Sequence, residues 1–147
     1  MSQYKHLLVA VDFSEPSIKA LDTALELAVR LGAHLTIVHT VVKVAQSVSM
    51  NGGPGYDVPL FEKEIKESRA AIEKLLKEKN KEGVKTEIII ESGAAEEEIN
   101  RIADEKGADM LILGTHGRKG MEKLFLGSVA EEVLRNSHLP FLCVRSK

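Results

Sequence analysis

The sequence of 147 residues lacks the features that stabilise secreted chains or anchor membrane chains. It contains one cysteine, Cys143, which therefore has no partner for an internal disulfide. No apolar run approaches the ~20 residues that cross a bilayer as a helix. The first residues do not form a secretory signal. These absences predict a cytoplasmic protein that does not associate with a membrane.

The chain also has little net charge. Its 20 Lys and Arg residues and 22 Asp and Glu residues leave a formal charge of −2. Such a balance gives no overall positive potential that would attract nucleic acid, so an anion would have to be bound at a local site. The five histidines and Cys143 show no spacing typical of metal ligands. We therefore expect no nucleic-acid partner and no metal held by protein side chains alone.

Two common nucleotide-binding signatures are missing as well. The pattern G-x4-G-K-[ST] of P-loop hydrolases is absent, because Lys119 stands five residues after Gly114 and Gly120 is followed by Met121. No G-x-G-x-x-G pattern follows the first apolar run, as it does in dinucleotide-dependent oxidoreductases. Both enzyme classes are poor candidates.

The sequence does contain apolar runs that alternate with amphipathic segments. We expect strands at residues 7–11, 35–38, 84–90, 110–113 and 141–144. Helices are expected between Ser14 and Gly32, and at residues 59–81, 95–106 and 128–136, where Val129, Val133 and Leu134 should point inward. Residues 41–58 are poorly periodic and are expected to form a mobile loop.

This alternation is typical of an α/β fold with a parallel sheet and helices on both faces. The first, second and fourth strands are almost continuously apolar and should lie inside the sheet, whereas the more polar third strand should lie near an edge. The strand order 3-2-1-4-5 fits these constraints. The length and the 44% hydrophobic content predict a single domain over residues 1–147.

A sheet of that order opens a crevice where its winding reverses, at the carboxyl ends of the first and fourth strands. Asp12 and Gly114 follow these two strands. The Asp12 carboxylate could accept hydrogen bonds from a ribose or a base, or it could simply bond to the turn that follows it. Cys143 lies in an apolar run and is expected to pack as a small hydrophobic residue without a chemical role.

A glycine pattern marks the same place. Gly114, Gly117 and Gly127 can let main-chain amides approach a phosphate, although each also has an ordinary explanation as a turn or packing residue. Ser128 and Glu131 have the spacing of a capping box, which predicts a helix start that favours anions.

Two polar residues of the connecting segment are further candidates. His116 could donate to a phosphate and Arg118 could screen its charge, and both are equally compatible with an ordinary polar surface. The pattern as a whole favours a phosphorylated ligand.

With Asp12 after the first strand and the spacing G-x2-G-x9-G-[ST], the chain resembles the universal stress protein family over nearly its whole length. The resemblance implies a Rossmann-like fold of the adenine nucleotide alpha-hydrolase type. It also implies adenosine beside Asp12 and Thr40, and phosphates at the glycine motif. The expected site comprises Ala10, Val11, Asp12, Thr40, Leu113, Gly114, His116, Gly117, Arg118, Gly127, Ser128 and Val129.

The same resemblance implies ATP as the ligand, with AMP or ADP also possible, and Mg²⁺ or Mn²⁺ bound only through the phosphates. It implies a homodimer joined through the last strand, from Pro140 to Arg145. We expect a stress-response regulator in which the nucleotide orders the loops at residues 41–58 and 114–127 and so changes the surface that a protein partner binds. Three alternatives remain: a slow Mg²⁺-dependent ATP hydrolase, a phospho-acceptor switch similar to a response-regulator receiver with Asp12 at the end of its first strand, and a protein-binding dimer that does not use nucleotide.

Overall fold

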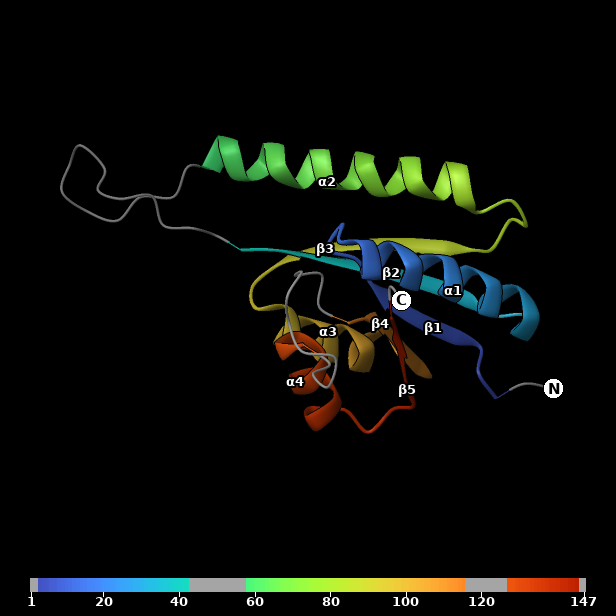
Figure 1. Cartoon of the computed structure of the whole chain (residues 1–147). Helices are drawn as coiled ribbons and strands as arrows, with labels where there is room; N and C mark the ends of the chain where they lie inside the picture. Colours follow the sequence, from blue (N-terminus) through green and yellow to red (C-terminus); the bar gives the residue numbers. More distant parts are fainter. Residues whose placement is uncertain (1–2, 43–57, 116–126, 146–147) are drawn as a thin grey trace, which may run out of the picture.

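The structure is a computed structural model that describes residues 3–42, 58–115 and 127–145 (Figure 1). Its elements are, in chain order, β1 (His6–Ala10), α1 (Glu15–Leu31), β2 (His34–Val41), α2 (Val58–Lys79), β3 (Thr86–Ser92), α3 (Ala95–Lys106), β4 (Met110–Gly114), α4 (Ser128–Asn136) and β5 (Phe141–Val144). The five strands pair in parallel in the order β3-β2-β1-β4-β5. This confirms the expected order 3-2-1-4-5.

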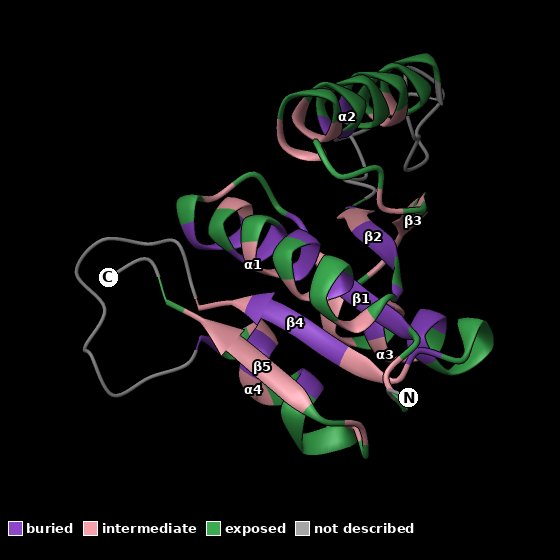
Figure 2. Ribbon diagram, turned by 90° about the vertical axis from the view of Figure 1, so that its right-hand side faces the viewer, coloured by how far each residue is buried: buried purple, intermediate pink, exposed green. Residues whose placement is uncertain are grey.

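Helices cover both faces of the sheet, as predicted. One hydrophobic cluster joins α1 and α2 to the sheet through residues such as Leu21, Ile72 and Val9. The other joins α3 and α4 to the opposite face through residues such as Ile102 and Val133. Figure 2 shows the buried positions of α1 turned toward the sheet and the exposed positions turned outward. Along β1, successive residues alternate between the two clusters: Leu7 and Val9 belong to the first and Leu8 to the second.

The first helix begins and ends where its sequence dictates. The Ser14 side chain accepts a hydrogen bond from the Ser17 amide, and Pro16 occupies the first turn, where no helical amide partner is lost. Gly32 ends the helix in the left-handed conformation, with φ 67°. The predicted extent of this helix, between Ser14 and Gly32, is confirmed.

Other boundaries and one packing prediction need correction. β2 continues to Val41, α2 spans Val58–Lys79, and β3 begins only at Thr86. Leu134, which was expected to point inward, is 45% exposed, because the inner side of α4 is formed by Ala130 and Val133. The expected mobile loop at residues 41–58 falls almost wholly outside the described residues.

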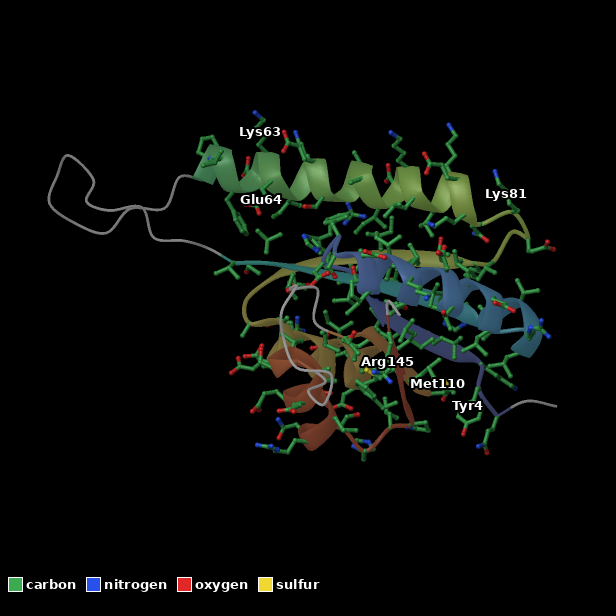
Figure 3. The ribbon with its side chains drawn as sticks, in the orientation of Figure 1. Tyr4, Lys63, Glu64, Lys81, Met110 and Arg145 are labelled. Carbon is green, nitrogen blue, oxygen red and sulfur yellow. The ribbon has the colours of Figure 1, made fainter. Side chains whose placement is uncertain are left out.

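α2 is held over the sheet by a narrow apolar side. Ile72 is buried there, and most charged residues of the helix are exposed, with Lys63 pointing away from the sheet (Figure 3). Lys79 Nζ lies 2.8 Å from Asp22 Oδ1 and so links α2 to α1. Arg69 Nη1 donates to the Ile88 carbonyl oxygen, 3.4 Å away, on the outer edge of β3. The edge position predicted for the third strand is confirmed.

The amino end of the sheet is closed by its own polar groups. Asp109 Oδ2 accepts hydrogen bonds from the main-chain amides of Lys5 and His6, at 2.8 and 2.9 Å. The buried His6 ring contacts the Lys106 carbonyl oxygen through Nδ1 and Thr36 Oγ1 through Nε2, at 3.1 and 2.6 Å. Burial, and then the neighbouring His34 ring, hold the pKa of His6 below its ordinary value. The polar groups of Asp109 and His6 are therefore bonded within the protein.

Candidate functional site

A cavity opens at the opposite, carboxyl end of the sheet. It encloses about 640 Å³, counting the part that is open to solvent. Its walls are the ends of β1, β2 and β4 and the starts of α1, α3 and α4. This is the place where the winding of the sheet reverses, and ligands of open α/β sheets bind there.

Nine of the expected site residues line this cavity. They are Ala10, Val11, Asp12, Thr40, Leu113, Gly114, Gly127, Ser128 and Val129. The other three, His116, Gly117 and Arg118, lie outside the described residues. The topology therefore brings together residues that are more than 100 positions apart in the sequence.

The cavity is also lined by seven residues that were not among the site residues expected from the sequence. They are Ser14, Ser17, Val38, Ala95, Ile99, Thr115 and Ala130. Ser14 marks the start of the first expected helix, and Ile99 lies within the helix expected at residues 95–106. A signal for Thr115 was available, because it follows Gly114 at the end of β4. The aliphatic members carry no sequence signal that separates a cavity wall from the core.

The Asp12 carboxylate is committed to the turn between β1 and α1. Its Oδ1 accepts hydrogen bonds from the Ser14 amide, at 2.9 Å, and from the Ser14 hydroxyl. Burial alone would raise the pKa of Asp12, but hydrogen bonds, first those with Ser14 and then that with Ser17, together outweigh it and lower the pKa. The turn interpretation of Asp12 is confirmed, and the residue also lines the cavity, whereas hydrogen bonding to a ribose or a base stays a prediction.

Gly114 is a glycine because α1 lies against it. A Cβ atom at this position would stand 2.5 Å from the Pro16 carbonyl carbon and 2.7 Å from the Ser17 nitrogen. These are main-chain atoms and cannot move aside without moving α1. The close-packing explanation of Gly114 is the one that the geometry supports, and this packing brings the start of α1 to the end of β4.

The start of α4 differs from the predicted capping box. Gly127 is the residue before the helix, with φ 101°, and no side chain of the described residues caps the helix there. Ser128 is the first residue of the helix itself, so its hydroxyl does not take the capping position. The predicted Ser128–Glu131 pair is therefore wrong, and the first amides of α4 remain without side-chain partners within the described chain.

The three helix starts around the cavity are not equivalent. α1 is capped by Ser14, and α3 carries Glu96, Glu97 and Glu98 in its first turn. α4 has only Glu131 there and is preceded by a buried glycine. Since uncapped amides and the positive end of the helix dipole attract anions, α4 offers the best place for a phosphate.

No group of three or more His, Cys, Asp or Glu residues among the described residues is arranged to hold a metal ion. No helix in that part of the chain is long and apolar enough to cross a membrane.

The fold and the cavity define a class of proteins: parallel α/β domains with a ligand site at the switch point of the sheet. Comparison with known proteins narrows the class. The model of the universal stress protein family matches residues 3–145. Over 147 aligned positions the chain is 35% identical to universal stress protein YxiE of Bacillus subtilis, and the match covers 97% of this chain and 99% of the relative. The chain belongs to the universal stress protein family.

Solved structures agree with this assignment. Universal stress protein MJ0577 of Methanocaldococcus jannaschii has a TM-score of 0.82 with this chain at 31% identity, and the match covers 99% of both chains. A universal stress protein solved in complex with cAMP has a TM-score of 0.65 at 26% identity, over 99% of this chain and 100% of that one.

Proposed function

We propose that residues 1–147 act as one adenine-nucleotide-binding domain of a cytoplasmic stress-response regulator. The observation that carries the proposal is the cavity at the carboxyl ends of β1, β2 and β4, which the uncapped start of α4 faces. The related protein that was solved with cAMP supports an adenine nucleotide as the ligand class.

In this proposal the two sides of the cavity bind different parts of ATP. Asp12 and Thr40 lie beside the adenosine, and Ala10, Val11 and Leu113 form the wall behind it. Gly114, Gly127, Ser128 and Val129 surround the phosphates, together with His116, Gly117 and Arg118. AMP or ADP would occupy the same place with fewer phosphate contacts. Mg²⁺ or Mn²⁺ would be bound through the phosphates.

Isothermal titration of nucleotide-free protein with ATP tests this division. Asp12→Ala should weaken both ATP and adenosine by about tenfold or more, because it removes a polar group from the adenosine side. Asp104→Ala is the matched control, since Asp104 is an exposed aspartate on α3 away from the cavity. An Asp12→Ala variant with unchanged affinity would refute the adenosine side of the site.

The phosphate side is tested by Ser128→Pro. Proline is tolerated at the first position of a helix, so α4 should survive while it loses one free amide and one hydroxyl. ATP affinity should fall by about tenfold and adenosine affinity by less than about twofold. Equal losses for the two ligands would show that α4 does not hold the phosphates.

We further propose that the protein acts as a homodimer joined through β5, from Pro140 to Arg145, and that nucleotide occupancy changes the surface offered to a protein partner. β5 is an edge strand, and its residue Cys143 directs its amide away from β4. Cys143→Pro should therefore remove an outward amide with little effect on the β4–β5 pairing. Sedimentation should show a dimer for the natural chain and a monomer for this variant.

A further inference from the structure

The hydrogen bonds between β1 and β2 change partner where the two strands reach the cavity. The Val11 amide donates to the Val38 carbonyl oxygen at 2.8 Å, as in a regular parallel ladder. In a ladder that continued, the Val11 carbonyl oxygen would accept from the amide of Thr40, two residues further along β2. Instead it accepts from the ring of His39, whose Nδ1 lies 2.7 Å away.

This exchange of hydrogen-bond donors fixes the position of a proton on the His39 imidazole. A carbonyl oxygen can only accept, so Nδ1 of His39 carries a proton and donates it to Val11. The His39 side chain lies on the α1 and α2 face of the sheet, because its neighbours Val38 and Thr40 point to the other face and line the cavity. A side chain on one face thus takes the place of a main-chain amide in the plane of the sheet.

The group that loses its partner is the main-chain amide of Thr40. Its amide is not paired with β1 in the part of the chain that the structure describes. Because the N–H and C=O of one strand residue point to the same side, both groups of Thr40 point toward the end of β1, beside the cavity that Thr40 lines. A donor and an acceptor are left for a ligand.

A strained residue keeps the imidazole in place. Phe13 has a positive φ of 66°, which is unfavourable for a bulky side chain and persists only where its surroundings demand it. Its ring meets the His39 ring edge-on, with 4.9 Å between the centroids. Phe13 also follows Asp12 directly, so the same turn orients the cavity carboxylate and covers the imidazole.

We propose that His39 is a positioning residue of the nucleotide site. It donates to the Val11 carbonyl oxygen in place of Thr40, stops the β1–β2 ladder one step early, and so leaves the main chain of Thr40 available to the ligand. This inference rests on the proposed function only for the identity of the ligand. The rearranged hydrogen bonding can be tested without any nucleotide.

The first experiment follows hydrogen exchange of the Thr40 amide in nucleotide-free protein by NMR. In the natural chain this amide should exchange fast. In His39→Leu the Val11 carbonyl oxygen loses its donor and the ladder can close, so the Thr40 amide should become protected by about tenfold or more. In His39→Asn the side-chain amide stands where Nδ1 stood, and exchange should stay fast. A protected Thr40 amide in the natural chain would overturn the proposal.

The second experiment measures ATP affinity of the same variants. His39→Leu should weaken ATP by about tenfold, and His39→Asn should stay within about threefold of the natural chain. His138→Leu, which replaces an exposed histidine after α4, is the matched control and should have no effect. Equal affinity of His39→Leu and the natural chain would refute the role of His39, as would a loss that His39→Asn does not rescue.

The two experiments separate the possible failures. If the natural chain binds no adenine nucleotide, the proposed function fails and the exchange experiment still decides what His39 does. If the natural chain binds ATP but the Thr40 amide is protected before nucleotide is added, the proposed function stands and the inference about His39 fails.

Discussion

The two ends of the sheet use similar residues for opposite purposes. At the amino end, Asp109 and His6 bind main-chain and side-chain groups of the protein and line no part of the cavity at the opposite end. At the carboxyl end, Asp12 and His39 also bind the main chain, but their bonds hold a turn and a strand end beside a cavity. The comparison teaches that a polar residue type does not define a site. What matters is whether its hydrogen bonds satisfy the neighbouring main-chain N–H and C=O groups or leave some of these groups unpaired beside a cavity.

The largest effect is expected from Gly114→Ala at the carboxyl end. The added Cβ would overlap main-chain atoms of Pro16 and Ser17 and force α1 away from β4. We expect a loss of roughly 3 kcal/mol in the free energy of unfolding, with loss of nucleotide binding. Chemical denaturation and titration with ATP measure the two losses.

Gly107→Ala separates this clash from the general cost of replacing a glycine. Gly107 ends α3 with φ 69°, and nothing lies within 4 Å of the position that its Cβ would take. Only the left-handed conformation is penalised, by about 1 kcal/mol, and ATP affinity should not change. Similar losses for the two variants would contradict the packing role of Gly114.

A smaller loss is expected at the amino end from Asp109→Asn. The neutral amide keeps the size of the side chain but weakens the acceptor of two main-chain amides, from Lys5 and His6. We expect a loss of about 2 kcal/mol in the free energy of unfolding and less than about a twofold change in ATP affinity. If ATP affinity fell tenfold with this variant, the two ends of the sheet would not be independent.

At the carboxyl end, Ser14→Ala should cost about 1 kcal/mol, because α1 loses its side-chain cap. It also removes the hydroxyl that donates to Asp12 Oδ1, which is the first of the hydrogen bonds that lower the pKa of Asp12, whereas the main-chain amide of residue 14 still donates. A lowered carboxylate pKa stabilises the fold above the ordinary value of 3.8, and this stability is lost as the pH falls through the folded value. Denaturation between pH 5 and pH 2 should therefore show a weaker acid dependence in Ser14→Ala than in the natural chain.

The smallest effect concerns the pH dependence of the amino end. The pKa of His6 is lowered first by burial and then by His34, so the unfolded chain binds a proton more readily than the folded one. Stability from this residue is complete above pH 6.5 and is lost as the pH falls through the lower folded value. His34→Gln removes the second cause and should make stability fall less steeply between pH 7 and pH 5. An unchanged slope would show that the stacked rings, 4.0 Å apart, do not interact electrostatically.

The sequence predicted the fold well because periodicity and helix signals act locally. α3 was predicted with its observed bounds, and the caps of α1 are where Ser14 and Gly32 put them. The order of the strands followed from how apolar each one is. Errors arose where a local pattern had two solutions, as at Ser128, which begins α4 instead of capping it.

The site was predicted only in part, for a physical reason. Residues at strand ends could be placed at the cavity, because the topology brings those ends together. The role of Gly114 depends on how close α1 comes, and the role of His39 depends on one hydrogen bond to a residue 28 positions away. Neither the close approach of α1 to Gly114 nor the hydrogen bond from His39 to Val11 can be recognised from a single sequence. Ser14 and Ser17 were missed for the same reason, since their local role in α1 conceals their place at the cavity.

The contact between Arg69 and the outer carbonyl oxygen of Ile88 has a consequence for assembly. It hinders the addition of a foreign strand next to β3, whereas the rim formed by β5 has no such guard among the described residues. In the proposed dimer, strand addition would therefore be limited to the β5 side of each molecule. When only one side can associate, and it associates with its own copy, the assembly stops at two subunits and does not propagate into fibres.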